Sequence, residues 1–265
     1  MLAAVRERLD MREALREALD RGELSLRYQP VVALADERIV SLEALLRWER
    51  PDGEIIGPDR FIGLAEESGL IIPIGRWVLR EACAALAAWQ RHAPGLRMAV
   101  NISSVQLADP QLLDDVASAI AGSGIRPGEL TLELTESALA ANDAAARLAA
   151  LRGLGVQVAV DDFGTGYSSL SYLRRLEIDC VKIDRSFVAG ISDRGQDAAL
   201  VRSIVELAHA LDLQVIAEGI EVAGEADVLR ESGCRLGQGF LFAGPQSAAA
   251  ITLRLGEPRR AIMTA

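Results

Sequence analysis

Seven β-rich runs of the chain end in, or close to, polar side chains that could bind a metal ion or take part in catalysis. Five of these side chains are carboxylates, two are amides and one is an amine. A single carboxylate after a strand usually caps a helix or faces solvent. The whole set predicts one shared site, because chance alone would not be expected to place a polar side chain at the end of so many strands. The residues are Glu43, Asn101, Glu133, Asp161 with Asp162, Lys182, Glu218 and Gln238.

The five carboxylates define the chemistry of such a site. They would carry five negative charges, and repulsion and desolvation would protonate some of them unless cations bind. A pair of divalent cations would cancel most of this charge. Oxygen ligands without His or Cys favour Mg²⁺ or Mn²⁺ over Zn²⁺. Adjacent Asp161 and Asp162 suit a site in which one carboxylate bridges ions about 3.5–4 Å apart, an arrangement that cleaves phosphodiesters with an activated water.

Lys182 is the only lysine among 28 basic residues, and the others are arginines. Codon bias explains the preference for arginine, but it does not explain a lysine in a strand-like run. Unlike arginine, lysine is a compact ammonium that can lose its proton in a tuned site. The carboxylates would keep Lys182 protonated, whereas bound metal ions would lower its pKa. Two roles stay open: a general base, or an ammonium that orients the attacking water.

The composition argues against several other classes of protein. With 28 basic and 38 acidic residues the net charge is −10, so binding of DNA or RNA through phosphate neutralisation is not expected. His92 and His209 lie in helical patterns, which argues against His-ligated phosphodiesterases and Ser-His-Asp hydrolases. No apolar stretch approaches the roughly 18 residues of a membrane span, and we expect a cytoplasmic chain without an export signal. Cys83, Cys180 and Cys234 are widely spaced and are expected to be reduced core residues.

The order of the runs predicts the elements that carry these side chains. Eight β-rich runs alternate with helical patterns, which is typical of an α/β fold and here of a modified TIM (β/α)8 barrel with its site at the carboxyl ends of the strands. The connection ALADE between the first two runs is too short for a helix, so one antiparallel strand is expected near the N-terminus. In LTLELTE, period-two alternation turns Thr131 and Glu133 into the barrel. The runs start at Leu24, Ile39, Arg97, Leu130, Val156, Cys180, Gln214 and Arg235, and the main helical patterns cover 3–21, 76–91, 110–123, 144–151, 196–211 and 223–232.

Eight short segments follow one another through almost the whole chain. They are YQP (28–30), EALLRW (43–48), NIS (101–103), ELTES (133–137), DDFGTGYSSL (161–170), KIDRSF (182–187), AEGIE (217–221) and QGFLF (238–242). In these segments the sequence resembles the EAL-domain cyclic di-GMP phosphodiesterases of bacterial signalling. The resemblance implies hydrolysis of cyclic di-GMP to linear pGpG by an enzyme that uses two Mg²⁺ or Mn²⁺ ions.

The resemblance also implies roles for individual residues. The first ion would be held by Glu43, Asn101, Glu133 and Asp161, the second by Asp161, Asp162 and Glu218, and the catalytic groups would be Lys182 and Glu218. The dinucleotide would contact Gln29, Leu45, Arg47, Glu221, Gln238 and Phe240. Glu136 and the loop from Asp162 to Ser169, which includes Thr165, would position the second ion and lie near the contact of a homodimer.

We expect three parts in the chain: a helix at 1–22 that ends a linker, the EAL domain at 23–255 and a tail at 256–265. The domain would stand alone or be fused to sensor or cyclase-like domains in a longer regulator. Two other functions stay open. One is a catalytically silent cyclic di-GMP receptor that signals through a partner, although such a receptor would be expected to lack metal ligands or the lysine. The other is a barrel lyase that forms a Schiff base on Lys182, whose nucleophilicity the carboxylates would weaken.

Overall fold

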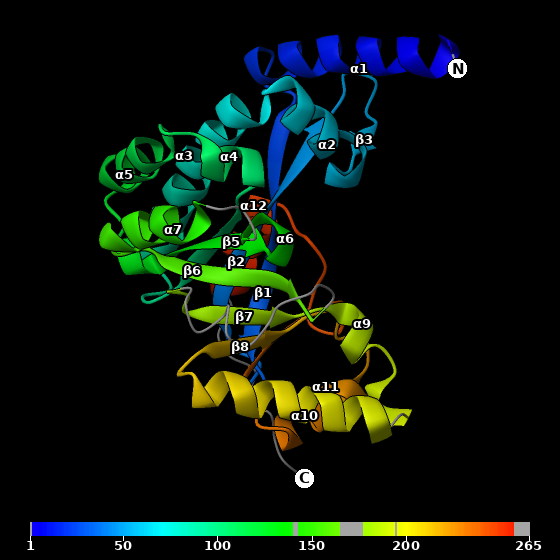
Figure 1. Cartoon of the computed structure of the whole chain (residues 1–265), viewed down its shortest axis with the longest axis vertical. Coiled ribbons are helices and arrows are strands. Elements are labelled where there is room, and N and C mark those ends of the chain that lie inside the picture. The colour runs from blue at the N-terminus through cyan, green and yellow to red at the C-terminus, as the bar shows by residue number, and fades with distance from the viewer. Residues whose placement is uncertain (1, 140–142, 165–176, 194, 257–265) are drawn as a thin grey trace.

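The computed structural model describes residues 2–139, 143–164, 177–193 and 195–256, and its strands form one closed sheet (Figure 1). The strand order is β1-β9-β8-β7-β6-β5-β4-β2-β3, and pairing of β1 with β2 closes the barrel with β3 outside it. This arrangement confirms the predicted modified TIM barrel. The strands are β1 (Leu24–Ala33), β2 (Ile39–Glu49), β3 (Ile55–Ile56), β4 (Arg97–Asn101), β5 (Leu130–Thr135), β6 (Gln157–Phe163), β7 (Cys180–Ile183), β8 (Gln214–Ala217) and β9 (Leu236–Gln238).

Strand β1 runs antiparallel to both of its neighbours in the barrel, whereas β2 and β4 to β9 run parallel to one another. A short turn, in which Glu37 adopts a φ of 55°, connects β1 to β2 and leaves no room for a helix. Through the pairs Val31↔Gln238 and Ala33↔Leu236, β1 also joins the first part of the domain to its last strand. The expected antiparallel strand near the N-terminus is therefore confirmed.

Helices surround the barrel (Figure 1). Each of the main helical patterns in the sequence corresponds to a helix, while α2, α12 and the helices of four or five residues were not predicted. The helices are α1 (Leu2–Asp20), α2 (Pro58–Ser68), α3 (Ile71–Gln90), α4 (Ser104–Ala108), α5 (Leu112–Ser123), α6 (Glu136–Leu139), α7 (Ala144–Gly153), α9 (Arg185–Val188), α10 (Gly195–Ala210), α11 (Ala223–Glu231) and α12 (Ala248–Gly256), with single 3₁₀ turns at Pro127–Glu129 and Ile191–Asp193.

Side chains on β5 alternate between the outer core and the barrel interior. Leu130, Leu132 and Leu134 are buried in the main hydrophobic core. Thr131 and Glu133 instead line a small cavity inside the barrel. The inward direction predicted for these two residues is thus confirmed, and the same alternation turns polar residues on the other strands towards the barrel axis.

Helix α1 is attached to the domain over part of its length. Leu15 and Ala18 near its end are fully buried in the core, and Arg8 pairs with Glu67 of α2 at 2.5 Å. The division of the chain near residue 22 stays a prediction. Among the described residues, no helix has both the length and the apolar character needed to cross a bilayer.

Candidate metal centre

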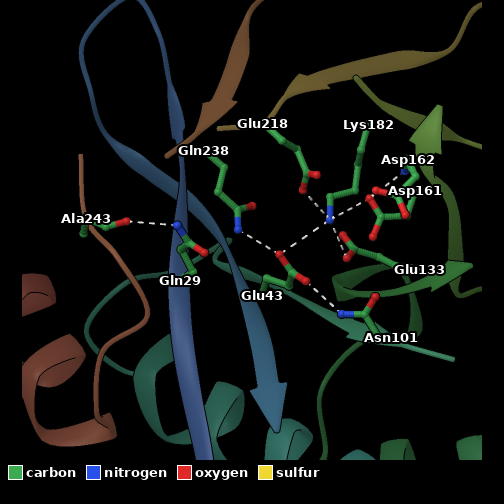
Figure 2. A network of polar contacts seen from close by, with 10 residues as sticks. All are labelled: Gln29, Glu43, Asn101, Glu133, Asp161, Asp162, Lys182, Glu218, Gln238 and Ala243. Atoms are coloured by element: carbon green, nitrogen blue, oxygen red, sulfur yellow. Dashed lines mark hydrogen bonds and ion pairs between the residues drawn. The ribbon is translucent and has the colours of Figure 1, made fainter. Parts of the chain in front are cut away.

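The eight polar residues predicted to form one site lie together at the carboxyl ends of the barrel strands (Figure 2). Neighbouring strands contribute one or two each, so the site depends on the closed barrel. Glu43 comes from β2, Asn101 from β4, Glu133 from β5, Asp161 and Asp162 from β6, Lys182 from β7, Glu218 from the residue after β8, and Gln238 from β9.

Lys182 lies at the middle of this group, and its side chain is only 1% exposed. Its Nζ atom is 2.7 Å from Glu218 Oε1 and 2.8 Å from Glu133 Oε2. It is also 3.3 Å from Asp161 Oδ1 and 3.5 Å from Glu43 Oε2. A single buried ammonium therefore faces four carboxylates.

The charges of these groups shift one another's pKa values. Burial alone would lower the pKa of Lys182, but the charges of the four carboxylates outweigh it and raise that pKa well above its usual value. Burial raises the pKa of Glu133 well above its usual range, against the attraction of Lys182. Burial likewise raises the pKa of Glu218 to about 7, although Lys182 opposes it. One ammonium is thus too little positive charge to keep every carboxylate ionised.

Two amide side chains hold Glu43 from opposite sides. Asn101 Nδ2 donates to Glu43 Oε1 and Gln238 Nε2 donates to Glu43 Oε2, both at 2.8 Å. Although burial opposes it, the charge of Lys182 and these hydrogen bonds lower the pKa of Glu43. Gln238 Oε1 is buried without a hydrogen-bond partner among the described residues. Glu43 is therefore fixed as a carboxylate, and Gln238 keeps an acceptor for a further donor.

A bulge in β6 turns two adjacent aspartates towards the site. The pairing of β6 with β7 runs through Val160↔Val181 and then Phe163↔Ile183, so Asp161 and Asp162 both lie opposite Lys182. Asp162 adopts a φ of 55°, and its backbone N–H donates to Asp161 Oδ1 at 3.0 Å. In a regular strand the two side chains would point to opposite faces. The bulge is what brings both carboxylates into one site.

The donor set fits a divalent cation. One carboxylate oxygen from each of Asp161, Asp162 and Glu218 lies within 4.8 Å of the others. Burial raises the pKa of Asp162, and the neighbouring Asp161 adds to this effect. All these atoms are hard oxygen donors, and Lys182 alone does not offset the charge of the carboxylates, which is a deficit that a divalent cation relieves. Of the remaining predicted ligands, Glu43 and Glu133 contact Lys182, and Asn101 donates a hydrogen bond to Glu43.

Two glycines allow the loops of the site to pass close to their neighbours. Gly219, directly after Glu218, has a φ of +70°, and a Cβ atom there would lie 2.3 Å from Arg185 Cβ. A Cβ atom on Gly239, directly after Gln238, would lie 2.1 Å from the carbonyl oxygen of Ile220. Only glycine fits at either place, so the conformation of both site-bearing loops depends on these residues.

The residues expected to contact substrate differ in how they are held. Gln29 Nε2 donates to the carbonyl oxygen of Ala243 at 3.1 Å, beside the site (Figure 2). Leu45 and Arg47 are partly buried on β2, and Glu221 is exposed. Phe240 is 69% exposed. These positions leave the substrate roles of all five residues as predictions.

Glu136 is buried at the start of α6, where its Oε2 atom accepts a weak hydrogen bond from the backbone N–H of Gly164 at 3.4 Å. It thus contacts the segment that follows the aspartate pair. Thr165 and the rest of the loop to Ser169 lie outside the described residues.

Glu225 supports the site and was not predicted from the sequence. Its buried carboxylate accepts hydrogen bonds from the backbone N–H groups of Gly190, Glu221 and Val222, at 2.8 to 3.2 Å. It therefore ties the segment after α9 to the loop that carries Glu218. A glutamate at the third position of α11 is a capping signal that could have revealed this local role, but the contact with Gly190 arises only in the folded chain.

Comparison with known proteins gives a consistent result. The family profile of the EAL domain matches residues 12–245. The cyclic di-GMP phosphodiesterase NbdA of Pseudomonas aeruginosa is 44% identical over 256 residues, which are 95% of this chain and 32% of NbdA. The cyclic di-GMP phosphodiesterase PdeR of Escherichia coli is 45% identical over 89% of this chain and 36% of its own length. The chain thus spans about a third of the length of these relatives.

A solved structure shows the same similarity at the level of the fold. The PaMucR phosphodiesterase, in complex with c-di-GMP, is 41% identical to this chain and superimposes with a TM-score of 0.86. The similarity covers 90% of this chain and 98% of that one. Together with the profile match and the arrangement of the site, these findings show that the chain belongs to the EAL domain family.

Proposed function

We propose that this domain hydrolyses one phosphodiester bond of cyclic di-GMP and releases linear pGpG. The observation that carries the proposal is the buried cluster of carboxylates around Lys182, complete in every predicted ligand. The names of the relatives support the choice of substrate. A silent receptor is disfavoured because no ligand is replaced, and a lyase because Lys182 is held as an ammonium that cannot attack a carbonyl carbon.

We propose that two Mg²⁺ or Mn²⁺ ions complete the site. Glu43, Asn101, Glu133 and Asp161 would hold the first, and Asp161, Asp162 and Glu218 the second. When bound, the ions supply Lewis acidity, which offsets the charge of the phosphodiester and makes an attacking water more acidic. Asn101 would use its amide oxygen, since its Nδ2 atom is already bonded to Glu43.

Lys182 and Glu218 are the proposed catalytic groups, and they have different capacities. As an ammonium, Lys182 donates hydrogen bonds and orients an attacking water or a phosphate oxygen. Glu218, whose Oε1 lies 2.7 Å from Lys182 Nζ, has the lone pairs that can accept a proton from that water. The pair thus provides a donor and an acceptor on one side of the site.

The three buried cysteines form no disulfide, and both they and the proposed substrate suit a cytoplasmic protein. The length of the relatives supports a place for this domain as the hydrolytic part of a longer signalling protein. A homodimer formed near the loop after β6 also stays a prediction.

Product analysis tests the proposal. Purified protein should convert cyclic di-GMP to pGpG in Mg²⁺ and in Mn²⁺, and EDTA should stop the reaction. Asp161→Asn should lower kcat/KM by at least about 100-fold and remove the increase in Tm that Mn²⁺ gives to the wild type. Asp114→Asn, which changes an exposed aspartate of α5, is the matched control and should behave as the wild type.

The wild-type result separates the alternatives. Absence of product with both metals would refute the hydrolase. Tight binding of cyclic di-GMP without product over hours would instead support a receptor.

A further inference from the structure

Beyond the metal centre, β1 and β2 continue as a two-stranded ribbon with an arginine on each strand. In the register of the pair, Gln29 lies opposite Glu43, Arg27 opposite Leu45, and Ser25 opposite Arg47. Since side chains alternate along a strand, the residues at every second position share the face of Glu43. Arg27 therefore lies on the same face as Glu43, two residues or about 7 Å further along the ribbon than the Gln29–Glu43 pair.

The opposite face of the ribbon is part of the hydrophobic core. Leu24, Leu26 and Tyr28 of β1 and Leu46 and Trp48 of β2 pack there. The two arginines are thus on the ribbon face that the metal centre occupies further down. Because the residues before and after each arginine point into the core, the arginine side chains must point to the opposite face.

Arg47 is held by a backbone contact and not by an ion pair among the described residues. Its Nη1 atom donates to the carbonyl oxygen of Leu46 at 2.8 Å, and among the described residues no carboxylate lies within ion-pair distance of it. Burial lowers the pKa of Arg47, and the nearby charge of Arg27 lowers it further, against the weaker attraction of Glu43 and Asp59. Two close guanidinium groups on one face repel each other, and an anion between them removes that repulsion.

Arg27 is held by a contact that an anion can replace. Its Nη2 atom lies 2.8 Å from Glu49 Oε1, and the same oxygen accepts a hydrogen bond from Ser25 Oγ at 2.7 Å. The side chains of Arg27 and Glu49 are 30% and 41% exposed. An ion pair at this exposure contributes little, because water and salt screen it. A phosphate that also reached Arg47 would compete well with Glu49.

We propose that Arg27 is a specificity-determining residue that, together with Arg47, binds the phosphate of the cyclic dinucleotide that is not being cleaved. This inference rests on the proposed function. A cyclic dinucleotide has two phosphodiesters joined through its riboses, so with one at the metal centre the other lies a ribose away. We place it along the ribbon, where the two arginines lie. Guanidinium groups can bind two phosphate oxygens at once. Glu49 holds Arg27 at the ribbon until the phosphate replaces it.

The test compares two substrates, cyclic di-GMP and bis(p-nitrophenyl) phosphate, which has one phosphodiester. Arg27→Gln should lower the ratio of kcat/KM for cyclic di-GMP to kcat/KM for the small diester by about tenfold, mainly through KM. Arg27→Lys, which keeps the charge, should recover part of the loss. Arg76→Gln, which breaks an ion pair of 2.7 Å between α3 and α5, is the matched control and should leave the ratio unchanged.

Equilibrium binding in EDTA provides the second measurement. Arg27→Gln should raise the Kd for cyclic di-GMP about tenfold, and Glu49→Gln should lower it about threefold by releasing Arg27. An unchanged substrate ratio in Arg27→Gln, or an equal loss on both substrates, would overturn the role of Arg27. The proposed function is tested separately with the wild type. If the wild type bound cyclic di-GMP without hydrolysing it, catalysis would be refuted, but the Kd of Arg27→Gln relative to that of the wild type would still test the role of Arg27.

Discussion

At the scale of residues, the site is organised by one buried cation. Lys182 Nζ reaches carboxylates from four other strands or strand ends, and arginine could not take its place, because a planar guanidinium is larger and cannot be surrounded in this way. In the absence of metal the ammonium partly neutralises the cluster. We infer that Lys182 contributes to folding as well as to catalysis.

Lys182→Met tests this double role. Methionine has a similar length but no charge, so in EDTA at pH 8 the carboxylates would be left without a cation. The free energy of unfolding, measured with urea, should fall by about 3–5 kcal/mol. The difference should shrink at pH 5, where the carboxylates take up protons. Mn²⁺ should raise the Tm of the variant more than that of the wild type, and an unchanged stability in EDTA at pH 8 would contradict the structural role.

At the scale of elements, the site depends on irregular features of otherwise regular strands. The bulge in β6 aims two successive aspartates at one point, and the glycines after β8 and β9 let those loops pass close to their neighbours. A replacement at one of these positions moves a functional side chain without removing it.

Gly219→Ala is the direct test of this dependence. The new methyl group would lie 2.3 Å from Arg185 Cβ, at a φ of +70° that alanine adopts poorly. We expect a loss of about 1–3 kcal/mol in stability, with weaker Mn²⁺ binding by calorimetry, because Glu218 would be displaced. Gly63→Ala, in α2 with nothing near its Cβ position, should be neutral or stabilising by up to about 1 kcal/mol. Equal effects of the two changes would argue against the role of Gly219.

The barrel and the side chains around Lys182 could be predicted from the sequence. The alternation of side chains within a strand, as in β5, and the succession of β-rich runs and helical patterns can both be read along the chain. The sequence did not predict features that tertiary contacts create. Strand β3 has two residues and no periodicity of its own. The bulge at Asp162 and the bond from Gly190 to Glu225 appear only when separate segments meet. The placement of Arg27 near Arg47 likewise required the register of β1 with β2.

At the scale of the whole molecule, the core contains three cysteine thiols and a tyrosine hydroxyl that are buried in their neutral, protonated form. Burial raises the pKa of Cys83 to about 12 and that of Cys234 to about 11. Burial, with a smaller effect of Glu81, raises the pKa of Tyr28 to about 12. Burial also raises the pKa of Cys180. In the unfolded chain these groups would lose their protons at lower pH.

Stability should therefore fall as the pH rises above about 9, since the folded state retains protons that the unfolded state has released. For Cys83 alone the loss at pH 10.5 is about 2 kcal/mol, from its usual pKa near 9. Urea unfolding at pH 8 and at pH 10.5 measures the effect. Cys83→Ala should show a smaller difference between the two pH values than the wild type, and an equal difference would contradict the assignment to that thiol.

The pairing of β1 with β9 has a consequence for how the protein is made. Residues 31–33 of β1 pair with residues 236–238 in the sheet, and Tyr28 also forms a bridge with Gln246. During synthesis, the ribosome delivers the first of these segments long before the second, and until then β1 has one unpaired edge. Such an edge favours association with other chains, and contacts between distant segments form slowly. We therefore expect the nascent domain to depend on chaperones until its last strand emerges.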